Sequence, residues 1–160
     1  MLDMLVRLYD LPKLKPGIEA VKAHGIDIRQ DIAPEKHIVA AWIGKRFSSY
    51  WVSEAEVAFA NHPVSIWIAT HEGNCVGFAC YDTSSRAFFG PTGVDETYRG
   101  KGIGKALLLV TLHDMYAQGY AYGIIGDPGP TEFYEKAVGA VPIPGSSPGV
   151  YRGMLRENSG

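Results

Sequence analysis

The chain has 160 residues, of which 46% are hydrophobic and 20% are charged, as in an ordinary globular domain. Its formal net charge of −2 excludes the broad basic surface that would attract nucleic acids or anionic membranes, and the sequence has no apolar run of about 18 residues that would span a bilayer. Cys75 and Cys80 are the only cysteines, and their spacing disfavours a disulfide, so a reducing, cytoplasmic setting fits best.

The first part of the chain predicts a strand or helical turn, a brief helix, a strand and two further helices. Pro34 suits the first turn of the earlier of these two helices. Ser53 followed by Glu56 has capping-box spacing, which predicts the start of the later one. The expected ranges are residues 2–9, 18–24, 26–32, 34–47 and 53–60.

The remainder predicts a hairpin, a third strand, a long helix, a strand, a short helix and two final strands. Gly73 and Asn74 supply the tight turn of the hairpin, while Gly90, Pro91 and Gly93 interrupt the third strand and predict a bulge or splay. The long helix is apolar on more than one face, so it should be buried against a sheet. The expected ranges are residues 64–70, 75–81, 87–94, 102–118, 120–126, 130–137, 140–143 and 150–155.

A basic, glycine-rich turn, RGKGIGK over residues 99–105, joins the third strand to the long helix. At such a junction the first helical N–H groups lack intrahelical acceptors, and the peptide dipoles add about half a positive charge. Glycine lets a phosphate approach the backbone, while Arg99, Lys101 and Lys105 supply full charges nearby. The turn is therefore predicted to bind a pyrophosphate.

Two better-known phosphate loops do not fit this turn. A Walker A loop needs Ser or Thr after its Gly-Lys pair, but Lys105 is followed by Ala106. The dinucleotide fingerprint needs a third glycine where Leu107 stands. A protein that binds ATP or NAD through this turn is therefore the less favoured alternative.

The pattern Arg99-x-x-Gly102-x-Gly104, between a strand ending at Val94 and an apolar helix, resembles the acetyl-CoA signature of the GNAT superfamily of N-acetyltransferases. Downstream, the segment FYEKAVGA over residues 133–140 looks like the family's tyrosine-bearing helix and the strand after it. Two motifs in the expected order make this resemblance specific.

The resemblance covers about residues 26–155, and residues 1–25 look like an addition to the family core. It implies one acetyltransferase domain over residues 1–160. It also implies a mixed α+β (α/β) fold in three layers, with a central, mostly antiparallel, splayed sheet flanked by helices. The cosubstrate implied is acetyl-CoA, and no metal is expected because the histidines lack metal-ligand spacing.

On this resemblance, the Val94 amide would bond the thioester carbonyl and the turn would hold the pyrophosphate. Asp127 stands where the family commonly has Asn, so it keeps the acceptors but loses the amide donor. The positions implied for acetyl-CoA are Val94, Arg99, Gly100, Lys101, Gly102, Ile103, Gly104, Lys105, Asp127 and Phe133.

Tyr134 matches the position from which many members of the family protonate the departing thiolate. The alternative is a tyrosine whose ring packs on the cosubstrate and whose hydroxyl only bonds the sulfur. A general base is also needed, because an alkyl amine is mostly protonated at neutral pH. We select Glu96 for it, with Asp95, Glu72 and Asp82 as the other candidates.

The acceptor is expected to be an amine of a small molecule or peptide, and a small molecule more than a protein. An aromatic pocket would suit a small or partly apolar amine, although the same rings are equally compatible with a plain core. No nucleic-acid or membrane partner is expected, and exposed strand edges make a homodimer reasonable. A coenzyme A-binding sensor or interaction module without catalysis is the alternative function. The residues selected for the acceptor are Phe47, Tyr50, Trp51, Phe89 and Tyr151.

Overall fold

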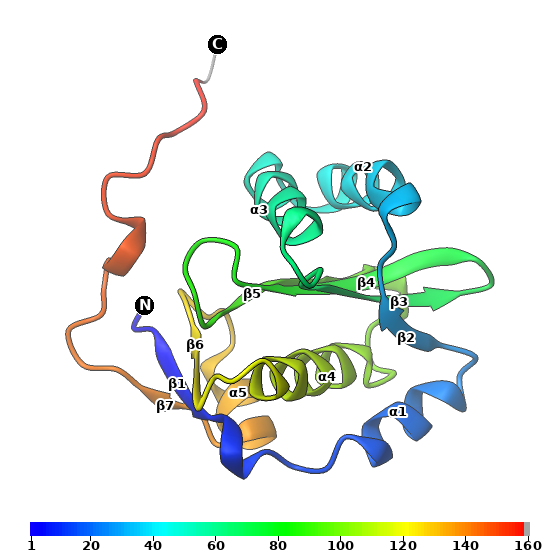
Figure 1. Ribbon diagram of the computed structural model, residues 1–160, viewed down its shortest axis with the longest axis horizontal. Helices are drawn as coiled ribbons and strands as arrows, with labels where there is room; N and C mark the ends of the chain where they lie inside the picture. Colours follow the sequence, from blue (N-terminus) through cyan, green and yellow to red (C-terminus); the bar gives the residue numbers. More distant parts are fainter. Residues whose placement is uncertain (159–160) are drawn as a thin grey trace.

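The computed structural model describes residues 1–158, which form a seven-stranded sheet with helices on both faces (Figure 1). Its strand order is β2-β3-β4-β5-β6-β1-β7. All neighbours are antiparallel except β5 and β6, which are parallel. The strands are β1 (Met4–Arg7), β2 (Asp27–Gln30), β3 (Ile66–His71), β4 (Asn74–Tyr81), β5 (Phe88–Val94), β6 (Tyr122–Ile125) and β7 (Val141–Pro142).

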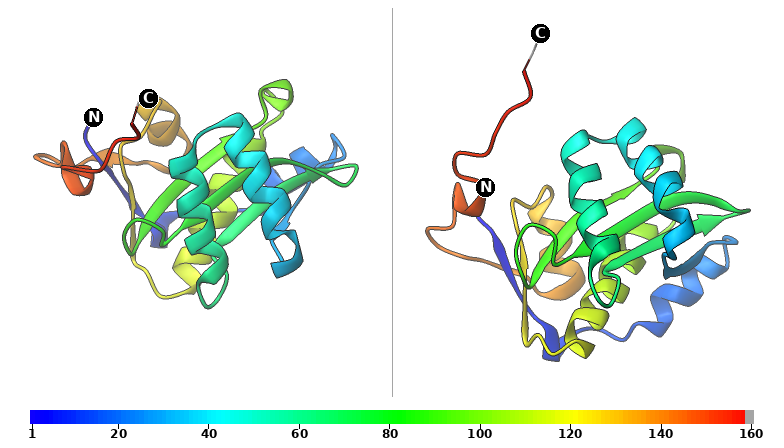
Figure 2. Two further views of the ribbon diagram at one scale, coloured as in Figure 1. Left: turned by 90° about the horizontal axis from the view of Figure 1, so that it is seen from above. Right: turned by 45° about the horizontal axis from the view of Figure 1, so that its top comes forward.

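The helices form two layers around this sheet, so the predicted three-layer mixed α+β fold is confirmed. One layer lies over β3, β4 and β5, and the other contains the long central helix (Figure 2). Between residues 1 and 158 no helix is both long and apolar enough to cross a membrane. The first layer is α2 (Lys36–Arg46) and α3 (Ser49–Ala60), and the second is α1 (Lys15–Lys22), α4 (Ile103–Ala117) and α5 (Thr131–Val138).

The main core lies between the sheet and α4. The helix buries every residue from Ala106 to Leu112, as its apolar sequence predicts. We expect the segment 1–25 to be an addition to the family core. It contributes β1 to the sheet and α1 to the helix layer that contains α4. Met4 and Val6 of β1 are fully buried, and β1 pairs with both β6 and β7.

The start of α3 differs from the prediction. Ser48, in extended conformation, caps the helix by accepting a 3.3 Å hydrogen bond from the Trp51 N–H. Ser53 instead lies inside the helix, where its hydroxyl donates to the Ser49 carbonyl. The capping-box spacing at Ser53 was therefore misleading, because an earlier serine already satisfies the free amides of the first turn.

The predicted final strand at residues 150–155 is wrong. The chain there forms a 3₁₀ turn at Gly149–Tyr151 and then an irregular tail. Gly149 and Gly153 adopt φ of +66° and +72°, which a strand cannot continue. In addition, β1 fills the place between β6 and β7. The homodimer, which two C-terminal strands would favour, stays a prediction.

Asp31 is a buried carboxylic acid at the junction between β2 and α2. Asp31 is only 4% exposed, and neither of its carboxyl oxygens has a hydrogen-bond partner within the described chain. Burial raises the pKa of Asp31 to about 7, and the nearby carboxylate of Glu35 contributes to this shift. Ionised Asp31 is therefore unfavourable in the folded protein.

Replacing Asp31 by Asn should change how stability depends on pH. The folded-state pKa lies above the unfolded value of about 4, so the folded protein holds this proton more tightly. Wild-type stability is then lost as the pH rises from about 4 to about 7, by about 2 to 4 kcal/mol. Urea unfolding at pH 4.5 and pH 8 should show this loss in wild type and in an Asp27→Asn control on the exposed side of β2, but not in Asp31→Asn. Parallel pH profiles for all three proteins would contradict the assignment.

Candidate active site

Strands β5 and β6 separate after a short contact. They pair at only two positions, Phe88 with Ile124 and Phe89 with Ile125. Beyond these, β5 continues along β4 as far as Val94. The predicted splay is therefore present, and so is the predicted irregularity, since the β4–β5 register shifts between Ala79 and Tyr81.

The Val94 amide faces this gap. The next amide along, that of Asp95, donates a 2.8 Å hydrogen bond to the Val76 carbonyl on β4. Because successive N–H groups of an extended chain point to opposite edges, the Val94 N–H is directed away from β4 and toward the side where β6 has diverged. This is the orientation that a carbonyl acceptor entering the gap requires.

The glycine-rich turn lies at the head of α4, as predicted. Gly100 and Gly102 both have φ of +82°, and a Cβ built on either would meet no atom within 4 Å, so the backbone is open to solvent. The first intrahelical bond is donated by Ala106 to the Gly102 carbonyl. The amides of Ile103, Gly104 and Lys105 therefore have no intrahelical acceptor and are available to an anion.

The turn is adjacent to Val94 and bordered by the N-terminal segment. A Cβ on Gly104 would lie 3.8 Å from Val94 Cγ2, so the glycine-rich turn and Val94 lie close together. A groove of about 360 Å³ runs between the turn and the region around α1. Lys13 and Lys105 line this groove. Arg99 and Lys105 are exposed and Lys101 is half-buried, so the positive charge lies at the surface of the turn.

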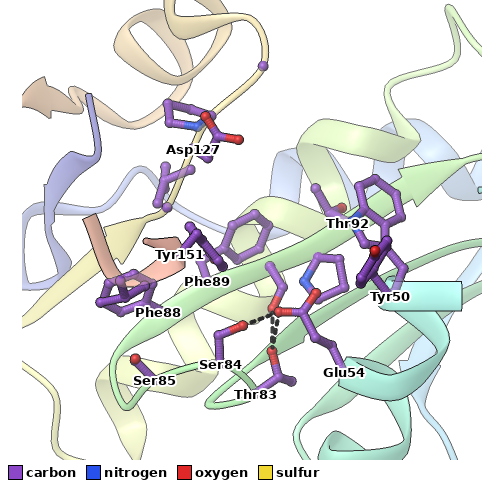
Figure 3. A pocket seen from close by; sticks show the side chains of 18 of the residues that line it. Tyr50, Glu54, Thr83, Ser84, Ser85, Phe88, Phe89, Thr92, Asp127 and Tyr151 are labelled. Atoms are coloured by element: carbon purple, nitrogen blue, oxygen red, sulfur yellow. Dashed lines mark hydrogen bonds between the residues drawn. The ribbon is translucent and has the colours of Figure 1, made fainter. Parts of the chain in front are cut away.

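A larger cavity of about 980 Å³ opens beside β5 (Figure 3). Its walls come from β5, the loop after β6, α3 and the C-terminal tail. This volume is within the range of small-molecule sites. Four of the five residues selected for the acceptor line it, namely Tyr50, Trp51, Phe89 and Tyr151.

Phe47, the fifth residue selected for the acceptor, is not on the cavity wall. Its ring lies under β5, where a Cβ on Gly93 would approach it to 2.5 Å. It also packs against Trp51, with ring centroids 4.9 Å apart. Its place in the structure is therefore in the core that supports the cavity from beneath.

Tyr134 lines the cavity from α5 and is 7% exposed. Its ring packs edge-on against Phe89 at 6.4 Å and against Phe133 at 5.1 Å between centroids. Burial raises the pKa of the Tyr134 phenol, so the hydroxyl is protonated at neutral pH. Phe133 itself is absent from the cavity wall, and its link to the cavity is this ring contact with Tyr134.

Asp127 lines the cavity at the start of the loop after β6. Its backbone is in the left-handed region, with φ of +43°, and its N–H donates a 3.1 Å hydrogen bond to the Asp3 carboxylate. The N-terminal segment thus fixes this loop. The Asp127 side chain is exposed and lies 3.9 Å from the N-terminal ammonium.

The carboxylates proposed as general base do not line the cavity. Glu96 is exposed on the 3₁₀ turn Glu96–Tyr98. Asp95 caps that turn through Thr97 and binds Arg46 at 2.8 Å, and the Thr97 N–H, followed by Arg46, lowers its pKa. Asp82 accepts a hydrogen bond from Tyr120 at 2.6 Å, and Glu72 is exposed at the β3–β4 turn.

The carboxylate that sequence reasoning missed is Glu54 on α3. It lines the cavity and accepts a hydrogen bond from Ser84, and the Thr83 hydroxyl lies 3.5 Å from the same carboxylate oxygen (Figure 3). A signal was present, because Glu54 follows Tyr50 by four residues and Trp51 by three, a spacing that places all three on one helix face. Recognising it required the position of the helix start to be correct.

Comparison with known proteins agrees with this geometry. The model of the acetyltransferase (GNAT) family matches residues 27–140. Among solved structures, a glucosamine N-acetyltransferase region of a fungal multi-domain GH3 β-N-acetylglucosaminidase aligns with 13% identity and a TM-score of 0.73, over 89% of this chain and 19% of that one. A GCN5-related N-acetyltransferase from Sphaerobacter thermophilus aligns with 20% identity and a TM-score of 0.69, over 89% and 48% of the two chains.

A third structure was solved with acetyl-CoA. It is a GNAT family acetyltransferase from Brucella melitensis, with 16% identity and a TM-score of 0.52, over 71% of this chain and 81% of that one. No curated protein matches the chain. At these identities the solved structures show a shared fold, and the chain spans less than half the length of the first two.

Replacing Gly102 by Ala should weaken coenzyme A binding about tenfold. The left-handed φ costs about 1–2 kcal/mol when a side chain is present, and the methyl group obstructs the approach of a phosphate. Gly73→Ala is the matched control, since Gly73 has φ of +79°, equally open surroundings and a place in the β3–β4 turn. Calorimetric titration should show weaker binding only for Gly102→Ala, while both variants lose similar thermal stability. Equal affinity in the two variants would argue against this turn as the anion site.

Proposed function

Because the chain belongs to the acetyltransferase (GNAT) family, we propose that it transfers an acetyl group from acetyl-CoA to the amine of a small molecule by direct attack in a ternary complex. The observation that carries this proposal is the convergence of three features on one gap. These are the outward Val94 amide, the free amides at the head of α4, and the cavity lined by Tyr134.

The donor substrate would be held by backbone groups. The amides from Ile103 to Lys105 would bind its pyrophosphate, supported by the charges of Arg99 and Lys105. The Val94 N–H would donate to the thioester carbonyl, whose oxygen gains negative charge as the amine attacks. A fixed donor aimed at that oxygen stabilises the transition state more than the ground state.

Tyr134 would act on the leaving group. When the C–N bond forms and the C–S bond breaks, the sulfur leaves as a thiolate that needs a proton. The buried phenol keeps its proton at neutral pH and can donate it at this point. Its ring contact with Phe89 fixes the hydroxyl beside the cavity and thus beside the acceptor.

Tyr134→Phe should lower kcat about 10²-fold with little change in the dissociation constant of acetyl-CoA, because only the proton donor is removed. Thiol release measured with a panel of amines tests this. Tyr122→Phe is the matched control, since the Tyr122 hydroxyl lies 3.4 Å from that of Tyr9 on the surface. An unchanged kcat in Tyr134→Phe would remove the acid role, and acetyl-CoA binding without turnover of any amine would instead identify a coenzyme A-binding module.

A further inference from the structure

Glu54 is a carboxylate in a cavity of otherwise mainly aromatic and neutral walls. It projects from α3 one turn after Tyr50, while Phe88 and Phe89 lie across from it on β5 (Figure 3). Apart from Glu54, the charged residues on the wall are Asp127, at the loop after β6, and Arg152, on the tail. The chain thus places one negative charge on the aromatic side of the acceptor cavity.

This carboxylate has no cationic partner in the described part of the chain. Within residues 1–158, no Lys, Arg or His side chain lies within 4.0 Å of its oxygens. A partly buried carboxylate that is not paired retains an unsatisfied preference for a positive charge, because desolvation costs energy that only a cation or strong donors offset. The side of the cavity around Glu54 is therefore complementary to a cation.

The hydroxyl groups around Glu54 leave it spare acceptor capacity. Ser84 donates to Oε1, and Thr83 lies at 3.5 Å from the same oxygen. A hydroxyl has a single proton, and Thr83 is closer to the Gly90 carbonyl, at 3.2 Å, so that carbonyl is the better acceptor for it. Since a carboxylate accepts about four hydrogen bonds, positions remain for the N–H groups of a ligand.

We propose that Glu54 binds the ammonium group of the acceptor and receives its proton, and that the acceptors are primary alkyl amines with an apolar body, which are cations at neutral pH. The aromatic walls hold the apolar body, and their ring faces also favour a cation. The inference rests on the proposed function and adds to it the substrate class and the acceptor-side residue.

The step that follows is balanced in atoms and charge. The ammonium nitrogen transfers one proton to a Glu54 oxygen, and its lone pair then forms the C–N bond to the thioester carbonyl carbon. The C–S bond breaks with its electron pair on sulfur, and this thiolate takes a proton from Tyr134. The nitrogen loses its second proton to solvent. Glu54 then releases the proton that it received to solvent, and the phenol is reprotonated from solvent.

Binding alone tests the site without relying on turnover. Calorimetry with 2-phenylethylammonium and with the neutral 2-phenylethanol should give wild type a preference for the cation of at least about tenfold. Glu54→Gln should lose this preference, because the amide is neutral and nearly isosteric. Glu56→Gln, on an exposed position of the same helix, should keep it. A wild-type protein without the preference, or a Glu54→Gln variant that retains it, would overturn the proposal.

The pH dependence of turnover gives the second readout. In Glu54→Gln, kcat/KM for the alkyl amine should rise about tenfold per pH unit below the amine pKa of about 10, because only the free amine reacts. In wild type and Glu56→Gln it should be level across neutral pH. Turnover with identical pH profiles in all three proteins would refute the role of Glu54 but leave acetyl transfer in place. A Glu54-dependent preference for the cation without turnover would refute acetyl transfer but keep the ammonium site.

Discussion

The structure depends on the point at which β5 and β6 stop pairing. Backbone N–H groups that leave a sheet need another acceptor, and a protein rarely leaves them without one in its interior. Here β5 stays bound to β4 as far as Val94, whereas the chain after Ile125 turns into a proline- and glycine-containing loop. The resulting gap brings together an unpaired amide, the head of α4 and an aromatic cavity, so the proposed donor and acceptor sites are consequences of one interruption in the ladder.

The N-terminal segment completes the part of the sheet beyond this gap. β1 is inserted between β6 and β7, and Asp3 accepts the N–H of Asp127 in the loop that borders the cavity. Further along, residues around α1 form the wall of the groove beside Gly102. Thus the first residues of the chain border both the loop at the cavity and the turn at the head of α4, although the family model begins at residue 27.

The features predicted correctly from sequence are those encoded by neighbouring residues. The glycine-rich turn, the buried α4 and the interruption of β5 each follow from a local pattern, because glycine placement and apolar periodicity act over a few residues. The irregular tail at residues 150–155 and the position of Glu54 on the cavity wall depend on segments distant in sequence. A predicted strand there also needs a place in the sheet, and β1 fills the place between β6 and β7. Similarly, Glu54 becomes notable only when α3 is placed against β5.

The C-terminal tail determines how easily the shape of this cavity can vary. Residues 150–154 form one wall of the cavity, and the tail is attached to α3 by two hydrogen bonds at the Tyr50 hydroxyl, to the Leu155 carbonyl and from the Glu157 N–H. Residues 150–154 belong to no strand, so pairing within the sheet does not restrict which residues form this wall. Insertions and exchanges there should alter the shape of the cavity while the sheet and its helices keep their packing, so this wall can change independently of the rest of the fold.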